Sequence, residues 1–233
     1  MMMSRKLALI TVLSLLVTHT TMASPNIVDL ALQGIGGGSV TEMKSRLLGR
    51  PFSICGPEDY RRVIASLPSS IRERRVSQGK LFRRVESIVR PVLELHGRGH
   101  TIELFLYRNQ FPQAMVWHGC VLTISASLAN ELHDDELAGI VGHEMGHGYF
   151  MNETIKARNH GDRQAMKIVE LRCDAVAMLS LKLLGHDPAD HLRGLRLIND
   201  LVRRNGYNGL DSTHHPSIVE RTQFAQRFLK LLT

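Results

Sequence analysis

The spacing of apolar residues along the chain changes from a helical period to a strand-like one and then back again. In the first part, apolar positions recur every three or four residues, which predicts helices over residues 57–66 and 81–95. Three short segments follow that are apolar or alternating and are separated by turn residues. They are residues 101–107, 113–117 and 120–125, and their pattern is typical of the strands of a small sheet.

The helical pattern returns after these strands and continues along the rest of the printed sequence. Asp134 or Asp135 can cap a helix that runs through Glu136 to about residue 150. Glycines at helix ends and prolines at first turns delimit three more helices, predicted over residues 162–184, 188–205 and 216–232. The prediction is an α+β fold, mostly helical, with one small sheet.

Residues 24–50 are loosely patterned, with a cluster of glycines between Gly34 and Gly38. A phosphate-binding loop would need a lysine and a preceding strand beside such a cluster, so we expect a flexible arm instead. Together with the helix at 57–66, this arm forms an N-terminal segment, residues 24–80. Its position suggests that it covers the cleft of the domain that follows.

The N-terminus has the three parts of a secretory signal peptide. Arg5 and Lys6 form a basic region, an apolar run follows them, and Thr21 and Ala23 place small residues before a cleavage site. The apolar run is shorter than the roughly 18 to 20 residues that span a bilayer, which favours a cleaved signal over a membrane anchor. We therefore expect cleavage after Ala23, and a periplasmic or secreted protein.

The net charge is mildly positive. The chain has 29 basic and 22 acidic side chains, and loss of residues 1–23 lowers the formal charge from +7 to +5 because only Arg5 and Lys6 are removed. This balance suits peripheral association with a membrane surface or with acidic envelope proteins. The basic stretch 72–84 matches no nucleic-acid-binding motif, so we interpret it as a solvated helix face and expect no nucleic-acid partner.

The cysteines are few and widely spaced. Cys55, Cys120 and Cys173 lack the close spacing of a structural zinc site, and three cysteines allow only one disulfide. An oxidising compartment would permit that disulfide, and the spacing leaves open which two cysteines form it.

The strongest chemical signal is the run Val-Gly-His-Glu-Met-Gly-His from Val141 to His147. On a helix His143 and His147 face the same way, so both imidazoles can bind one metal ion. Glu144 lies beside them, where it can reach a water in the open coordination position of the metal. This spacing indicates metal-assisted hydrolysis of an amide bond.

A zinc ion bound by two histidines needs a third protein ligand. The extended histidine motif would need glycine and histidine where Phe150 and Glu153 stand, so that class is excluded. A deformylase-like site would use an upstream cysteine. Cys120 is the nearest one, and its apolar neighbours favour a buried structural residue.

A downstream carboxylate remains as the third ligand. Glu170 and Asp174 are four residues apart on an otherwise apolar helix, so they share one face. Two acids in apolar surroundings are costly unless positive groups meet them, and zinc with its histidines would supply these. Asp174 would then accept a hydrogen bond from the far nitrogen of a zinc-bound histidine. The alternative is a solvated pair of acids that bind Lys167 or Arg172.

A histidine pair, His214 and His215, stands before Pro216 at the start of the last predicted helix. A histidine at that place can donate a hydrogen bond to the oxyanion of a tetrahedral intermediate. Taken alone, such a pair is more often part of a loop than of a site.

Four linked motifs resemble those of one family: residues 135–147, Glu170-x-x-x-Asp174, residues 185–188, and His215-Pro216 with Arg221. Together they look like the zinc metallopeptidases typified by the CAAX-prenyl endopeptidase and the bacterial heat-shock membrane protease. The resemblance implies a zincin-like fold in which the small sheet flanks the motif helix. It implies a gluzincin-type endopeptidase domain over residues 81–233.

The resemblance also implies the roles of the metal-site residues. One zinc ion per chain would be held by His143, His147 and Glu170. Glu144 would be the general base, and Asp174 would support a ligand or donate a proton.

The residues around the metal site have implied roles as well. By resemblance, His215 would stabilise the transition state and Arg221 would support it. The segment Gln113, Ala114 and Met115 would be the edge strand against which the substrate backbone lies, a use that open strand edges favour.

Two departures from the family pattern concern substrate preference. Cys173 stands where members commonly have alanine, and residues 113–115 read Gln-Ala-Met in place of Asn-Ala-Phe. The sequence also lacks the long hydrophobic helices of membrane-spanning members. It resembles the exported branch, which is associated with quality control of unfolded or misassembled envelope proteins. A rival hypothesis is a zinc-stabilised chaperone or adaptor without proteolytic activity, and Glu144 argues against it because a binding module needs no base beside the metal.

Overall fold

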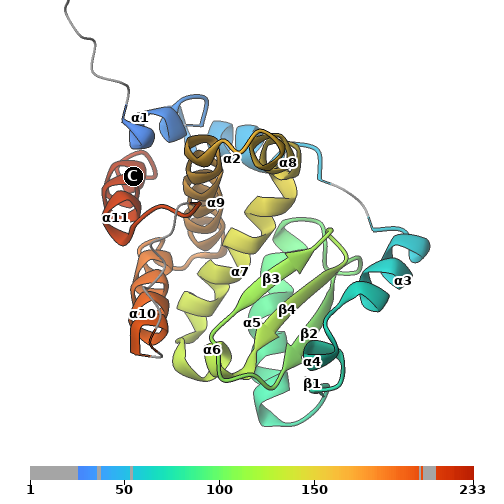
Figure 1. The fold of residues 1–233 in the computed structure, drawn as a ribbon. Coiled ribbons are helices and arrows are strands. Elements are labelled where there is room, and N and C mark those ends of the chain that lie inside the picture. The colour runs from blue at the N-terminus through green and yellow to red at the C-terminus, as the bar shows by residue number, and fades with distance from the viewer. Residues whose placement is uncertain (1–25, 36–37, 53–54, 205, 207–213) are drawn as a thin grey trace, which may run out of the picture.

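The computed structural model describes residues 26–35, 38–52, 55–204, 206 and 214–233 (Figure 1). The predicted signal peptide, residues 1–23, lies outside the described residues. In the part of the chain that is described, no helix is both long and apolar enough to cross a membrane.

The described residues form a mostly helical α+β fold with one small mixed sheet, which confirms the predicted fold class. The helices are α1 (Ile27–Leu32), α2 (Val40–Leu48), α3 (Pro57–Ser66), α4 (Ser69–Arg72), α5 (Lys80–Leu95), α6 (Ala126–Glu131), α7 (Asp134–Tyr149), α8 (Met151–Asn159), α9 (Arg163–Leu184), α10 (Asp190–Arg204) and α11 (Ile218–Leu229). The strands are β1 (Arg75–Val76), β2 (Glu103–Tyr107), β3 (Ala114–Trp117) and β4 (Val121–Ser125).

The sheet has the strand order β1-β2-β4-β3, so β3 lies at one edge. Strand β4 pairs in parallel with β2 and antiparallel with β3, and all five of its residues are buried. Antiparallel pairing on its β4 side leaves the other side of β3 unpaired within the sheet. This open edge faces α7, which lies between the sheet and α9 (Figure 1).

The two faces of the sheet bury separate apolar clusters because side chains alternate along each strand. Leu106 of β2 belongs to the main core with α5, α7 and α9, whereas Phe105 and Tyr107 join a smaller cluster with residues of α3 and α4. A disulfide between Cys55 and Cys120 fastens the start of α3 to the turn between β3 and β4. The question of which cysteines pair is thus answered, and Cys173 is the free, buried thiol.

Small residues let α7 and α9 approach closely. A Cβ atom at Gly146 would lie 2.7 Å from the Cα atom of Cys173, and one at Gly142 would lie 3.0 Å from the Cα atom of Ala177. Contacts this short exclude any larger residue unless the backbones move apart. The glycines on either side of His143 therefore set how near α7 comes to the acidic residues of α9.

The structure corrects the expectation for residues 24–50, which contain two helices where a flexible arm was predicted. Asn26 caps α1, and Ser39 with Glu42 forms a capping box at the start of α2. Met43 and Leu47 of α2 are fully buried, and both helices pack against α9. The prediction was wrong because α1 and α2 are each too short to show a clear apolar period in the sequence.

Helix starts elsewhere also differ from the prediction in detail. The N-cap of α7 is His133, and its backbone N–H donates a hydrogen bond of 2.9 Å to Glu136. Asp134 and Asp135, the predicted caps, lie in the first turn, where their negative charges interact favourably with the positive end of the helix dipole. The short elements α4, α6, α8 and β1 were not predicted.

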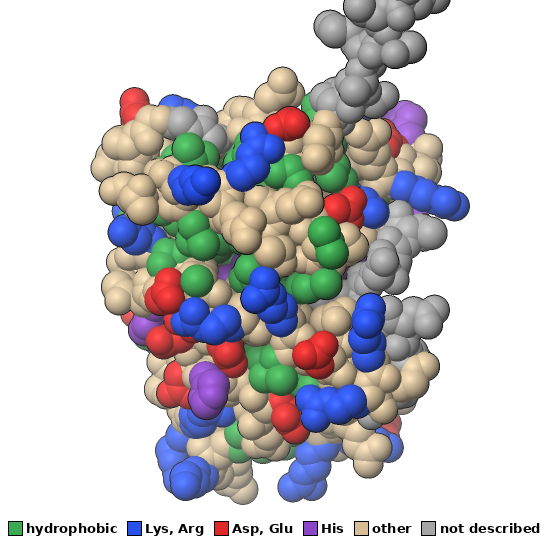
Figure 2. All heavy atoms as spheres, turned by 90° about the vertical axis from the view of Figure 1, so that its left-hand side faces the viewer, with side chains coloured by type: hydrophobic (Ala, Val, Ile, Leu, Met, Phe, Trp, Pro, Cys, Tyr) green, Lys and Arg blue, Asp and Glu red, His purple; other side chains and the backbone are tan. Residues whose placement is uncertain are grey.

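Charges on the surface are mixed in sign. On the face that carries α10 and α11, described lysine and arginine side chains are interspersed with aspartate and glutamate (Figure 2). The positive net charge is therefore not gathered into a single patch on that face.

A buried histidine joins α5, α7 and α9. His96 Nε2 donates to the hydroxyl of Ser180, since that hydroxyl donates its own hydrogen to Val176, and His96 Nδ1 accepts from the hydroxyl of Tyr149, at 3.0 Å each. Burial, aided by the charge of Arg98, lowers the pKa of His96 to about 3. His96 is therefore neutral in the folded protein at neutral pH.

This histidine makes folding stability depend on pH. Because the folded pKa of His96 is below the unfolded value of about 6.5, its contribution is complete above pH 6.5 and is lost as the pH falls toward 3. We expect about 2 kcal/mol less stability at pH 5 than at pH 7 from this residue. Urea unfolding of the wild type and of His96→Gln measures it. The Gln variant should lose this part of the pH dependence. If the unfolding free energy changed equally between pH 7 and pH 5 in the two proteins, the assignment would be contradicted.

Candidate metal centre

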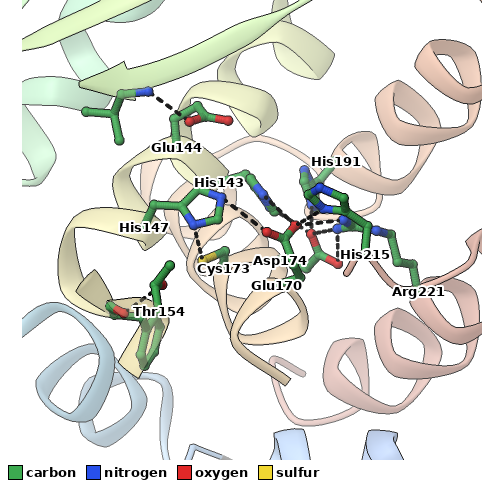
Figure 3. Close-up of polar contacts among 12 residues, drawn as sticks. His143, Glu144, His147, Thr154, Glu170, Cys173, Asp174, His191, His215 and Arg221 are labelled. Carbon is green, nitrogen blue, oxygen red and sulfur yellow. Dashed lines mark hydrogen bonds and ion pairs between the residues drawn. The ribbon is translucent and has the colours of Figure 1, made fainter. Parts of the chain in front are cut away.

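Helix α7 presents two histidines to one point. His143 and His147 lie one turn apart, with ring centroids separated by 4.9 Å and ring planes at 82°. Both project toward α9 (Figure 3). His143 is buried, and the side chain of His147 is 24% exposed; both line a cleft.

Glu170 of α9 lies against both rings. Its carboxylate oxygens are 3.5 Å from His143 Nε2 and 3.6 Å from His147 Nε2. A tetrahedral zinc ion with bonds of about 2.0–2.2 Å holds its ligand atoms about 3.3–3.6 Å apart. Each histidine thus has one carboxylate oxygen of Glu170 at the spacing of zinc ligands, and the three donor types are those of a zinc site.

Asp174, one turn further along α9, orients the first histidine. Its Oδ1 atom accepts a hydrogen bond of 2.8 Å from His143 Nδ1, which leaves His143 Nε2 free to face the metal position. Arg221 of α11 donates to both oxygens of Asp174, at 2.5 and 2.7 Å, and at 2.9 Å to Glu170. All three charged groups are buried, so the guanidinium offsets the repulsion between the two carboxylates.

The electrostatics of the site keep its acids ionised. Burial alone would raise the pKa of Asp174, but Arg221 and His143 hold that pKa well below its usual range. Burial likewise opposes protonation of His143, yet hydrogen bonds to Asp174 and Glu170 raise its pKa to about 10. A metal ion therefore has to displace a proton from His143, so that its binding releases protons.

Glu144 reaches out of α7 toward the edge strand. Its Oε2 atom accepts a hydrogen bond of 3.0 Å from the backbone N–H of Val116 in β3 (Figure 3). The contact fixes the carboxylate at the cleft wall, next to the two histidines. His143, Glu144 and His147 are also one of two groups among the described residues that could hold a metal ion.

The second such group is His143, Asp174 and His191. It is a poor metal site because the guanidinium of Arg221 already occupies both oxygens of Asp174. His191 comes from α10 and was not singled out in the sequence. Its signal was available: it stands on the apolar side of an amphipathic helix, in line with Leu195 and Ile198.

A cleft of about 840 Å³ opens between β3 and the helices of the site. His143, Glu144, His147, Glu170 and Arg221 all line it. Apolar side chains form much of the wall, among them Phe111, Met115, Met151, Ile155, Leu195 and Ile198. No described residue of the predicted cleft-covering segment, residues 26–80, lines this cleft.

The remaining predicted site residues also meet at this cleft. Gln113, Ala114 and Met115 line it along the edge strand, and Met115 is 38% exposed. His215 lies on the opposite side with its ring about half exposed, and its Nδ1 atom is 3.1 Å from the carboxylate of Glu170. The structure thus brings the predicted site residues to the lining of one cleft, except Asp174, which is buried and contacts the site through His143.

Two cysteines have roles that the sequence left open. Cys120, the deformylase-like candidate, is bonded to Cys55 and is not a metal ligand. The buried thiol of Cys173 lies 3.6 Å from His147 Nδ1. This contact, which sequence reasoning missed, gives the second histidine a weak partner for its far nitrogen.

A histidine pair on α7, a glutamate from α9 and an edge strand beside them form an arrangement suited to a metallopeptidase. Residues 78–173 match the model of Peptidase family M48, a family of zinc metallopeptidases. The match covers His143, Glu144, His147 and Glu170 and ends before Asp174, His215 and Arg221. A comparison with curated proteins finds no match.

His215 gives a prediction that separates catalysis from metal binding. As a donor to the oxyanion it would act in the transition state, so His215→Ala should lower kcat by roughly a hundredfold or more and change KM little. Zinc content should stay that of the wild type. Steady-state kinetics and metal analysis test this, with His214→Ala as the control because His214 lines the same cleft. An unchanged kcat, or loss of zinc, would contradict the assigned role.

Proposed function

We propose that this protein is a zinc-dependent endopeptidase that cuts unfolded or misassembled proteins of the cell envelope. The observation that carries the proposal is the approach of one Glu170 carboxylate to His143 Nε2 and His147 Nε2 at the ligand spacing of zinc. We expect one zinc ion per chain, because Arg221 occupies both oxygens of Asp174 in the second candidate group.

Each residue of the site has a part in hydrolysis. Zinc held by His143, His147 and Glu170 would polarise the scissile carbonyl and would make a water molecule more acidic. Glu144 takes a proton from that water and passes it to the leaving amine, and its bond to Val116 holds it in place for both steps. Asp174 fixes the tautomer of His143, and Arg221 holds Asp174 and Glu170 in position.

The cleft suits an extended chain with bulky apolar side chains. The open edge of β3 can pair with a substrate backbone, and such pairing needs a segment free of its own secondary structure. Met115 on β3 and Ile155 on α8 line the cleft and are among the most exposed large apolar residues described. Unfolded proteins present both features, an extended backbone and unburied apolar side chains.

Export is the second part of the proposal. The disulfide between Cys55 and Cys120 supports an oxidising compartment, where such bonds persist. We expect the mature protein to begin at Ser24 and to contain this disulfide. Intact-mass analysis of protein purified from the envelope fraction measures both at once. A mass that includes residues 1–23 would contradict cleavage, and free thiols at both cysteines would contradict an oxidising location.

The test of the proposed activity uses an unfolded substrate such as casein. The zinc-loaded protein should cleave it, a chelator should stop the cleavage, and added zinc should restore it. Binding of the substrate without any cleavage in the presence of zinc would instead support the rival chaperone or adaptor function.

A further inference from the structure

We propose that His191 is a positioning residue of the metal centre, which orients Asp174 and through it the zinc-binding His143. This inference rests on the proposed zinc site and deepens it. His191 lies in α10, so the site would depend on a helix that supplies none of the metal ligands.

The side chain of His191 contacts two residues of the metal site, Asp174 and His143. Its side chain is 1% exposed, and its Nε2 atom is 2.9 Å from Asp174 Oδ1, the same oxygen that accepts from His143. Its ring stacks on that of His143, with centroids 5.7 Å apart and ring planes at 22° (Figure 3). His191 therefore restrains both members of the pair that presents His143 Nε2 to the metal.

The chemistry of Asp174 fixes which nitrogen of His191 carries the hydrogen. An ionised carboxylate only accepts, so Nε2 must donate and Nδ1 must carry a lone pair. That Nδ1 atom is buried and has no hydrogen-bond partner among the described residues. Leaving a buried polar atom unpaired is unfavourable. A residue that served packing alone would be better replaced by an apolar one of similar size.

The backbone of α10 is held firmly against α7 at this position. A Cβ atom at Gly139 would lie 3.0 Å from the Cα atom of His191, and one at Gly194 would lie 3.3 Å from the Cβ atom of Glu136. This close packing on both sides of His191 leaves its ring little freedom to move. The hydrogen bond to Asp174 is thus available before a metal ion arrives.

The experiment compares two substitutions of nearly equal shape. In His191→Gln the side-chain amide can donate to Asp174 from about the place of Nε2, whereas His191→Met fills the same space without a donor. His191→Asn is the third variant, because its amide is one carbon too short to reach. The zinc dissociation constant of each protein is measured by competition with a chromophoric chelator. The melting temperature of each metal-free protein and the visible spectrum of its cobalt form are also recorded.

We expect Met and Asn to weaken zinc binding by about 10- to 100-fold and to alter the cobalt spectrum, with Gln close to the wild type in both. The metal-free melting temperature of the Met variant should change little, because removal of the unpaired buried Nδ1 atom offsets loss of the hydrogen bond to Asp174. Equal zinc affinity in all four proteins, or equal losses in Gln and Met, would overturn the inference. If Met alone fails to fold, the comparison of Gln with Asn decides. Failure of the wild type itself to bind zinc would instead refute the proposed function.

Discussion

A Glu144→Gln variant should keep its zinc and lose peptide hydrolysis by about a thousandfold or more. The structure shows why this substitution should change the basicity of the side chain and not its position. The amide oxygen of glutamine can still accept the hydrogen bond from the backbone N–H of Val116, so the side chain should stay in place. Only the ability to take a proton from water is removed. The ligands His143, His147 and Glu170 are untouched.

Metal content and casein cleavage are measured together on the same preparation. Glu153→Gln is the matched control, since Glu153 forms an ion pair with Arg50 and does not line the cleft. The control should cleave casein as the wild type does. Cleavage by Glu144→Gln at the wild-type rate would refute the proposed mechanism, and loss of its zinc would mean that Glu144 is a ligand.

Replacement of the two acids on α9 should cause two different failures. Glu170→Ala removes a carboxylate that lies against both histidines, so zinc affinity should fall steeply and cleavage with it. Asp174→Ala leaves all three ligands but frees His143 to rotate or change tautomer. Such a loss typically costs about 10- to 100-fold in affinity or activity. Excess zinc should therefore rescue Asp174→Ala in part and Glu170→Ala much less.

Stability has to be followed in both variants, because each leaves the buried Arg221 with fewer partners. Melting temperatures of the metal-free proteins separate that effect from metal binding. Full zinc occupancy of Glu170→Ala after dialysis against a mild chelator would place the third ligand elsewhere. Glu153, the first acid after the motif, is an unsuitable substitute because it is paired with Arg50.

The sequence predicted the parts of the fold that have strong local signals. Helix α9 runs almost as predicted, with Asp162 as its cap and Gly185 in the left-handed conformation at its end. The strands β2, β3 and β4 were each found within two residues. Helices α1 and α2 were not predicted, because their stability comes from packing on α9, which no local sequence pattern reveals.

The residues of the candidate site also fall into those that local spacing predicted and those that only the packing of helices shows. His143, Glu144 and His147 lie within about one turn of helix, so their spacing alone indicates that they act at one metal ion. Asp174 was expected to serve a zinc-bound histidine, and only the packing of α7 on α9 shows that His143 is the one it contacts. His191 and the Cys173 thiol were missed, since their contacts join residues 17 and 26 positions apart and depend on how helices pack.

The central claim is that His143, His147 and Glu170 hold zinc, and its most direct test is crystallographic. Diffraction data from zinc-loaded crystals, collected on both sides of the zinc absorption edge, locate the ion by its anomalous signal. The account predicts one strong peak per chain, about 2.0–2.2 Å from His143 Nε2, His147 Nε2 and a carboxylate oxygen of Glu170. A peak at His191 and Asp174, or no peak within bonding distance of Glu170, would contradict it.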